Sequence, residues 1–337
     1  MTGVAGFIGS HLAEILISSG YQVLGIDDLS GGVLANIPPK VSFENRSVVE
    51  PLDAVFQKFR PAVVFHLAAY AAEGLSHHIP LFNYNNNVLG TVNVLSAAYR
   101  ANCRHFVFTS SIAAYGHSTD GRPFDESTPC HPVDPYGAAK LACEHHIRGF
   151  QDYYGGPTYT IFRPHNVFGS RQNISDPYRN VVGIFMSRVV QGKALPIFGD
   201  GLQTRNFSHI SGVAEAIALA PRTERARNLT VNIGGDEVMS VLELARAIST
   251  EMKAEPQFEF LPARKEVRQA ECRHEVAHQV FPSISARALG IRAGLREMAD
   301  YVRSRPLPVP TECPTPIEIS DQLPPSWSQR LIGRRET

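Results

Sequence analysis

The chain has 337 residues, 43% of them hydrophobic, which is enough to bury a sizeable core in two domains or in one large and one smaller lobe. Its 32 basic and 32 acidic residues leave no net charge, which excludes a general attraction to nucleic acid or an anionic membrane. The five cysteines include no CxxC pair, and no apolar run approaches a membrane span. We therefore expect a reduced, cytoplasmic protein with a small-molecule partner.

Glycines recur every third residue at the start of the chain, directly before an apolar helix pattern, in Thr2-Gly3-Val4-Ala5-Gly6-Phe7-Ile8-Gly9. Without a Cβ, each glycine allows a sharp turn and lets a pyrophosphate approach the N–H groups of the following helix. The motif predicts a dinucleotide-binding turn. A strand should precede such a turn, and only Met1 is available for it, so we hypothesise that the first strand is truncated and that the true start lies upstream.

Short apolar strands alternate with amphipathic helices through the first half, which predicts a Rossmann-type α/β fold with a doubly wound parallel sheet. We expect strands at 22–26, 62–67, 105–109 and 158–162, and helices at 7–19, 83–100 and 136–153. Beyond Pro164 the alternation loosens around a helix at 241–252. We place the Rossmann domain at 1–163, a smaller α/β substrate-binding lobe at 164–304, and a proline-rich tail, pinned locally by Trp327, at 305–337.

Asp27 follows the expected strand 22–26, eighteen positions after Gly9, where a carboxylate can accept hydrogen bonds from the adenosine ribose hydroxyls. This carboxylate would repel the extra phosphate of NADP, and no arginine follows immediately, so the sequence favours NAD. The alternative interpretation of Asp27-Asp28 is a solvated turn.

Tyr136 and Lys140 lie four residues apart on an expected helix and therefore share a face. A free tyrosine has a pKa near ~10, and a nearby ammonium group favours its phenolate. Ser111, at the end of the expected strand 105–109, can share a hydrogen bond at the reacting oxygen. Together the three residues predict a proton-transfer site.

These motifs in register resemble the extended short-chain dehydrogenase/reductase family, and within it the NAD-dependent nucleotide-sugar 4-epimerases. The resemblance extends from Thr2 to about Arg303. Besides the glycine motif it rests on Phe65-His66-Leu67-Ala68-Ala69, Asn86-Asn87-Val88-Leu89-Gly90-Thr91, Ser110-Ser111-Ile112-Ala113-Ala114-Tyr115-Gly116, Tyr136-Gly137-Ala138-Ala139-Lys140, Arg163-Pro164-His165-Asn166, Phe198-Gly199-Asp200-Gly201 and Gln203-Thr204-Arg205.

The resemblance implies which residues form the site, because each occupies a position that matches one in the family's motifs. Those expected to hold NAD are Gly3, Gly6, Phe7, Ile8, Gly9, Asp27, Asp28, Ser47, Val48, Leu67, Ala68, Ala69, Asn87, Tyr136 and Lys140. Those expected to hold the substrate are Ser111, Asn166, Asn180, Phe198, Arg205 and Arg264. Asn166 and the two arginines would meet the diphosphate, Asn180 the sugar end and Phe198 the uracil. Val4 stands at a customary glycine or alanine and is expected to crowd the turn, and Ser47 stands at a customary aspartate.

The implied activity is epimerisation at C4 of a UDP-hexose through a 4-keto intermediate, with Tyr136 taking the hydroxyl proton while NAD takes the hydride. UDP-glucose, UDP-N-acetylglucosamine and UDP-glucuronate remain open as substrates. The resemblance also implies a homodimer formed through 83–100 and 136–153. The Ile112-Ala113 pair lacks the acids of the related dehydratases and the glutamate of the decarboxylases.

Two alternatives from other classes remain open. A vestigial NAD-binding protein would explain the altered first strand and substrate-lobe acids. The stretch His274-Glu275-Val276-Ala277-His278 matches the HExxH pattern of zinc proteases, but the sequence offers no convincing third ligand, so we expect no metal.

Overall fold

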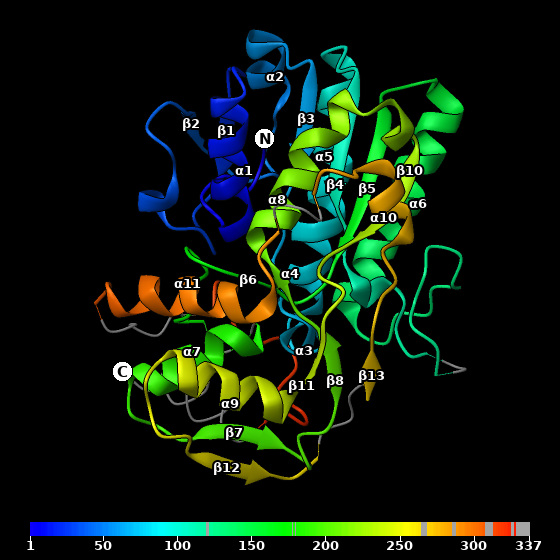
Figure 1. The fold of residues 1–337 in the computed structure, drawn as a ribbon. Helices are drawn as coiled ribbons and strands as arrows, with labels where there is room; N and C mark the ends of the chain where they lie inside the picture. The colour runs from blue at the N-terminus through cyan, green and yellow to red at the C-terminus, as the bar shows by residue number, and fades with distance from the viewer. Residues whose placement is uncertain are drawn as a thin grey trace.

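A seven-membered parallel sheet forms the centre of the larger unit in the computed structural model, which describes residues 1–118, 121–176, 178, 180–263, 268–284, 288–306, 313–324 and 327 (Figure 1). The order across the sheet is β2, β1, Met1–Gly3, β3, β4, β5 and β10. The strands are β1 (Leu24–Asp27), β2 (Ser42–Asn45), β3 (Val63–His66), β4 (His105–Thr109), β5 (Thr158–Pro164) and β10 (Leu229–Ile233). The predicted Rossmann-type fold is confirmed, with strand boundaries within two residues of those expected.

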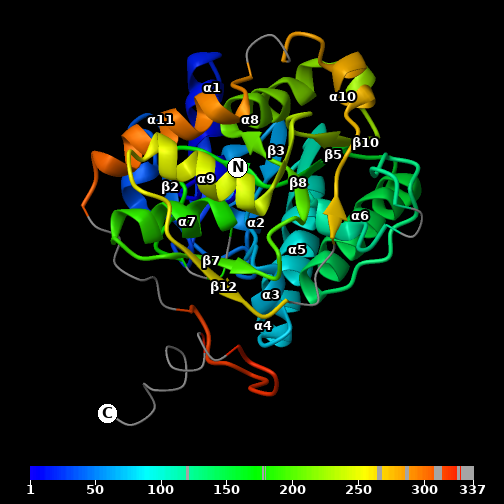
Figure 2. The same cartoon turned by 60° about the horizontal axis from the view of Figure 1, so that its bottom comes forward.

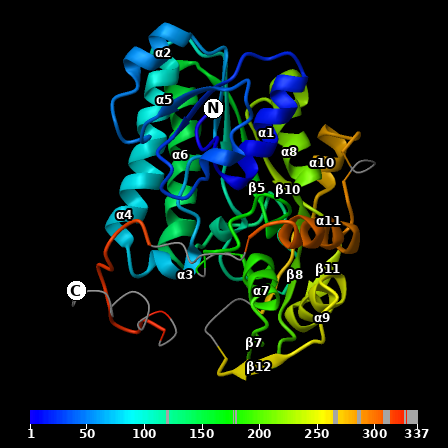
Figure 3. The same cartoon turned by 90° about the vertical axis from the view of Figure 1, so that its left-hand side faces the viewer.

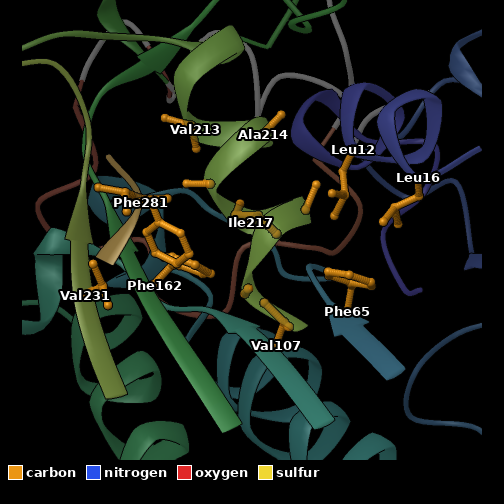
Figure 4. Packing of buried hydrophobic residues seen from close by; sticks show 14 of the residues in the cluster. Leu12, Leu16, Phe65, Val107, Phe162, Val213, Ala214, Ile217, Val231 and Phe281 are labelled. Carbon is orange, nitrogen blue, oxygen red and sulfur yellow. The ribbon is translucent and has the colours of Figure 1, made fainter. Parts of the chain in front are cut away.

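Helices cover both faces of this sheet because apolar residues point to both sides of its strands. On one face pack α1 (Phe7–Ser18), α8 (Ile210–Leu219) and α10 (Glu275–Val280), and on the other α2 (Asp53–Phe59), α5 (Gly90–Arg100) and α6 (Pro135–Tyr154). Figure 4 shows the first apolar cluster, in which Leu12 and Leu16 of α1 meet Ile217 of α8 above Val107 and Phe162 of the sheet. Each face of the sheet therefore has its own core.

Only three residues occupy the central position of the sheet. Met1 O accepts from Ile26 N at 2.9 Å, Thr2 N donates to Phe65 O at 2.9 Å, and Gly3 N donates to Ile26 O at 2.8 Å. Met1 and Thr2 line an open, mostly apolar pocket of about 130 Å³ together with residues of the neighbouring strands β1 and β3. Residues 1–3 thus join β1 to β3 and deliver the chain to the glycine turn. The hypothesis of an upstream start stays a prediction.

Val4 does not crowd the turn, which corrects the expectation from the sequence. Its side chain is fully buried and packs against Gly25 of β1, on the side of the turn away from the cleft described below. A Cβ at Gly25 would lie 2.5 Å from Val4 Cγ1 and 2.9 Å from both Val4 Cβ and Val4 Cγ2. The larger residue in the turn is therefore accommodated by the missing side chain in the adjacent strand.

The second lobe collects most of the chain after Pro164. Its helices are α7 (Val181–Val190), α9 (Val241–Glu251) and α11 (Ile291–Arg303), which share one apolar cluster with β7 (Leu195–Phe198). Its other strands are β6 (Val167–Phe168), β8 (Thr204–Asn206), β9 (Ser208–His209), β11 (Val238–Ser240), β12 (Phe258–Leu261) and β13 (Gln269–Ala270). Between β9 and β11 the chain returns to the first unit, where α8 packs on α1 and β10 pairs with β5.

The expected helix 83–100 is built from three pieces. These are α4 (Pro80–Tyr84), a π-helical turn (Asn85–Leu89) and α5. The extra residue in a π-turn is a local feature that hydrophobic periodicity does not reveal. In the part of the chain that the structure describes, no helix combines the length and apolarity needed to cross a membrane.

Substituting Gly25 by alanine should lower the free energy of unfolding by about 1–3 kcal/mol, because the new Cβ overlaps Val4. Combining it with Val4→Ala should cost less than the sum of the two single substitutions, since the smaller side chain restores the space. Urea unfolding of the four proteins measures this coupling. Strictly additive losses would contradict the packing described here.

Candidate active site

A large cleft with a volume of about 1500 Å³ lies between the carboxyl ends of the parallel strands and the second lobe. Ligands of open α/β sheets bind outside the carboxyl ends of the strands. Most of the residues expected from the sequence line this one cleft: Gly3, Gly6, Phe7, Ile8, Gly9, Asp27, Asp28, Val48, Leu67, Ala68, Ala69, Ser111, Tyr136, Lys140, Asn166, Asn180, Phe198 and Arg205.

The glycine turn brings three backbone segments together at one wall of the cleft. Gly3 has a φ of +74°, and a Cβ there would lie 2.7 Å from Ala68 N, while a Cβ at Gly9 would lie 1.9 Å from Gly3 O. Helix α1 then begins at the cleft with Gly6 as its N-cap, no acidic residue in its first turn and no capping side chain in the described structure. The first N–H groups of a helix are anion-binding donors when no side chain caps them. The wall therefore fits the pyrophosphate of NAD.

Asp27 holds this wall together from the end of β1. Its carboxylate oxygens accept hydrogen bonds from Ala5 N and Leu29 N, both at 2.9 Å. Burial raises the pKa of Asp27, and the two backbone hydrogen bonds partly offset the effect. Because each carboxylate oxygen has a second lone pair, Asp27 can fix the turn and still accept a ribose hydroxyl. Asp28 is exposed and accepts from Ser30 N at 3.0 Å.

The expected proton-transfer residues are buried together at the end of β4. Ser111 Oγ accepts from Ala113 N at 3.1 Å and so caps the 3₁₀ turn Ile112–Ala114. Lys140 Nζ donates to Thr109 O at 2.8 Å and lies 5.8 Å from the centre of the Tyr136 ring. Burial lowers the pKa of Lys140 to about 8, although Cys143 and Glu144 favour its charged form. A cation at this distance stabilises a phenolate.

Glycine allows the helix that carries Tyr136 to approach the serine turn. A Cβ at Gly137 would lie only 2.4 Å from Ala113 O, so the first turn of α6 packs directly on the backbone after Ser111. Asp134 caps this helix, since its Oδ1 accepts from Gly137 N at 2.8 Å. Tyr136 N donates to Ser76 Oγ at 3.2 Å. The backbone around Tyr136 is thus fixed on both sides.

The sequence reasoning missed a buried charge cluster below these residues. Glu144 Oε1 accepts from Ser110 Oγ at 2.6 Å and from Arg163 Nε at 2.8 Å, and its Oε2 accepts from Arg163 Nη2 at 2.6 Å and Arg148 Nη2 at 2.7 Å. Glu144 is eight residues after Tyr136 and four after Lys140, on the same face of α6. This spacing was the signal in the sequence that could have placed Glu144 close to the proton-transfer residues. The cluster ties α6 to β4 and β5.

We expect Glu144→Gln to lower the free energy of unfolding by about 3–5 kcal/mol, because it leaves the buried guanidinium of Arg163 without its counter-charge. Burial would raise the pKa of Glu144, but hydrogen bonds and charge from Arg163, with Ser110 and Arg148, outweigh it and lower the pKa. This stabilisation is present above the ordinary value of 4.5 and is lost as the pH falls through the lowered pKa.

Denaturant unfolding at several pH values measures both effects, with Asp152→Asn, an exposed acid on the same helix, as the control. The variant should lose part of the acid dependence seen in the wild type. Equal stability of Glu144→Gln and the control at neutral pH would show that the cluster does not hold α6.

Four expected substrate residues line the cleft from the second lobe and its entrance. Asn166 Nδ2 donates to Asn206 O at 2.9 Å. Asn180 caps α7 through Val182 N at 2.9 Å and also donates to Val167 O at 3.0 Å. Phe198 ends β7, and Arg205 Nη1 donates to Thr204 O at 2.7 Å and to Arg268 O at 3.1 Å. Arg264 lies outside the described residues.

Two expected cofactor residues do not line the cleft. Asn87 is buried in the π-helical turn, where its amide oxygen accepts from Tyr70 N at 2.9 Å and its Nδ2 donates to Asn83 Oδ1 at 2.8 Å. The neighbouring Asn86, in the same π-helical turn, lines the cleft instead. Ser47 also lies off the cleft, with its N–H bonded to Glu50 Oε1 at 3.1 Å, and its neighbours Arg46 and Val48 line the wall.

The HExxH stretch joins a hydrogen-bond chain in which His165 and His274 are buried. His274 Nδ1 lies 2.7 Å from Asp236 Oδ1, and its Nε2 lies 2.6 Å from His165 Nε2. His278 Nε2 lies 3.4 Å from Asp236 Oδ2. Both ring nitrogens of His274 are therefore engaged with protein partners. The histidines fix the loop after β10 against the segment after β5.

Residues 313–324 of the C-terminal segment lie beside α3 (Glu73–Ser76) and α4, as Figures 2 and 3 show. Glu318 accepts from Leu81 N at 2.7 Å and Phe82 N at 2.9 Å, which caps α4. Trp327 packs edge-on against Tyr178, with 5.1 Å between the ring centres, and lines the cleft together with Ile319. These contacts are those expected of a local anchor at Trp327, and the pinning of the tail stays a prediction.

Replacing Glu318 by alanine should release the tail, because it removes both acceptors for the α4 N–H groups, a contribution of about 1 kcal/mol. Trp327 is the single tryptophan of the chain, so a red shift of its fluorescence emission reports the release directly. Asp321→Ala, an exposed acid of the same segment, is the matched control. An unchanged emission maximum in Glu318→Ala would contradict this anchoring role.

A Rossmann-type sheet, a glycine turn and a Ser-Tyr-Lys set around one cleft are typical of the short-chain dehydrogenase/reductase class. A model of the NAD-dependent epimerase/dehydratase family matches residues 1–234, and the chain belongs to this family. A putative UDP-glucose 4-epimerase of Methanocaldococcus jannaschii is 36% identical over 253 residues, 75% of this chain and 81% of the relative.

A solved structure and a further sequence relative agree with this assignment. The UDP-glucose 4-epimerase of Thermotoga maritima, crystallised with UDP-glucose, superposes with a TM-score of 0.84 and 31% identity over 90% of this chain and 97% of that one. By sequence, a dTDP-D-glucose 4,6-dehydratase of Bos taurus is 31% identical over 74% of this chain and 71% of its own length. The similarities thus include epimerases and dehydratases of nucleotide sugars.

Proposed function

We propose that this protein is a UDP-hexose 4-epimerase that uses NAD. The observation that carries the proposal is one cleft in which Ser111, Tyr136 and Lys140 lie between the glycine turn of the sheet and the Phe198 and Arg205 wall of the second lobe. The first wall suits a dinucleotide, and the second presents an aromatic face and a guanidinium for a base and a diphosphate.

The chain's own residues supply proton transfer and orientation. Tyr136 takes the proton of the sugar 4-hydroxyl, and Ser111 shares a hydrogen bond with the same oxygen. Lys140, held by Thr109 O, favours the phenolate by its charge. The chemistry that NAD supplies when bound is reversible hydride transfer to and from C4 of the sugar. Arg205 and Phe198 anchor the UDP part while the sugar turns over in the cleft.

Epimerisation is favoured over loss of water by the residues after Ser111. Ile112 and Ala113 form the 3₁₀ turn beside the reacting position and carry no acid or base for an elimination. Incubation of the protein and NAD with UDP-glucose, UDP-N-acetylglucosamine and UDP-glucuronate, followed by chromatography, tests the proposal. A 4-epimer is the expected product, whereas a 4-keto-6-deoxy sugar would assign a dehydratase.

Tyr136→Phe should reduce kcat by at least about a hundredfold, because it removes only the hydroxyl that transfers the proton. Circular dichroism and tightly bound NAD should stay as in the wild type. Ser111→Ala should have a smaller effect of the same kind. Full turnover in Tyr136→Phe would overturn the acid–base assignment, while absence of both NAD and turnover in the wild type would favour the vestigial alternative.

The homodimer and the cytoplasmic location stay predictions. For the dimer we propose the exposed face of the segments 83–100 and 136–153, that is the end of α4, the π-helical turn, α5 and α6, because it carries large side chains that a partner could cover. These include Tyr84, Leu89, Tyr99, Tyr153 and Tyr154.

A further inference from the structure

Glu73 lies in the cleft at a position that the sequence reasoning did not single out. It begins α3, directly after the loop that follows β3, and its side chain is open to the cleft that Ser111 and Tyr136 also line. Ser76 Oγ donates to Glu73 O at 2.6 Å and accepts from Tyr136 N at 3.2 Å. The backbone of Glu73 is therefore linked by two hydrogen bonds to the start of the helix that carries Tyr136.

The Glu73 carboxylate has no hydrogen-bond or ion-pair partner among the residues that the structure describes. Asp134, the cap of α6, faces it and repels its negative charge, while Arg205 attracts it from the second lobe. His77, four residues further along, also lines the cleft. Protein atoms around the cleft and the charge of Asp134 raise the pKa of Glu73 to about 7, against the opposite effect of Arg205.

Glu73 is exposed to the cleft, so water can solvate its carboxylate in the free protein, and a ligand that displaces this water must supply hydrogen-bond donors in its place. The hydroxyl groups of a hexose are such donors, whereas a second carboxylate brought to the same place would meet Glu73 and Asp134 with like charge. Trp327 lies 3.2 Å from the position of a Cβ on the adjacent Gly74, so the tail walls this side of the cleft.

We propose that Glu73 selects the sugar of the substrate, accepting hydrogen bonds from a neutral hexose and excluding sugars that carry a carboxylate. This inference rests on the proposed function, because it takes the same cleft to hold a nucleoside-diphosphate sugar. Of the three substrates left open above, it disfavours UDP-glucuronate. It makes Glu73 a specificity residue that leaves proton transfer to Tyr136.

The test compares kcat/KM for UDP-glucose and UDP-glucuronate at pH 8.5, where the Glu73 carboxyl group is ionised. The wild type should prefer UDP-glucose by at least about tenfold. Glu73→Gln, which keeps the shape and removes the charge, should reduce this preference at least about tenfold, mainly by lowering KM for UDP-glucuronate. Glu73→Asp, which keeps the charge, should retain the preference.

An unchanged ratio in Glu73→Gln, or a wild type that prefers UDP-glucuronate, would overturn the inference. The failure of the proposed function has a different signature, namely that the wild type epimerises neither sugar. In that event calorimetric titration of the wild type and Glu73→Gln with the two nucleotide sugars decides the inference independently. Tighter binding of UDP-glucose that disappears in Glu73→Gln supports it, and equal discrimination by both proteins refutes it.

Discussion

The carboxylate of Glu144 joins three elements that are far apart in the sequence. It binds Arg163 of β5 through two hydrogen bonds and Ser110 at the end of β4, from the middle of α6. Because Tyr136 and Lys140 lie on the same face of α6 and Ser111 follows Ser110, a shift of this helix would separate the proposed proton-transfer residues. Burying the two charged side chains of Glu144 and Arg163 is expensive, and removal of either leaves the other without its counter-charge. The ion pair and its hydrogen bonds offset this cost and hold α6 in register against the sheet.

Close backbone contacts determine the cleft as much as side chains do. Gly3 and Gly9 allow the turn to fold under the start of α1, and Gly137 allows α6 to approach the carbonyl of Ala113. Each contact closes a gap that a methyl group would hold open. At Val4 and Gly25 the combined side-chain volume of the two positions matters. The larger residue in the turn fits because the facing residue of the strand has no side chain. Judged from the turn alone, Val4 was expected to crowd the pyrophosphate side, whereas its side chain packs against Gly25 of β1.

Periodicity and spacing predicted much of this architecture for physical reasons. Strands such as β4 are buried on both sides and therefore appear as uninterrupted apolar runs, and α1 and α6 carry their apolar residues on one face. The π-helical turn at 85–89 escaped prediction because one extra residue hardly changes the pattern, and within this turn Asn86 rather than Asn87 lines the cleft. Strand β10 was missed because its position beside β5 depends on a contact between residues about seventy positions apart.

The sequence by itself determined the class of fold, the glycine turn, the acid after β1 and the Ser-Tyr-Lys set, because each is a local pattern imposed by backbone geometry or by helix and strand periods. Only the tertiary structure decided what surrounds that set. It joined Glu144 to Arg163, directed Val4 towards Gly25, laid Trp327 against α3 and left the Glu73 carboxylate facing the cleft. These relations depend on which distant segments share a volume, and a linear pattern contains no such information.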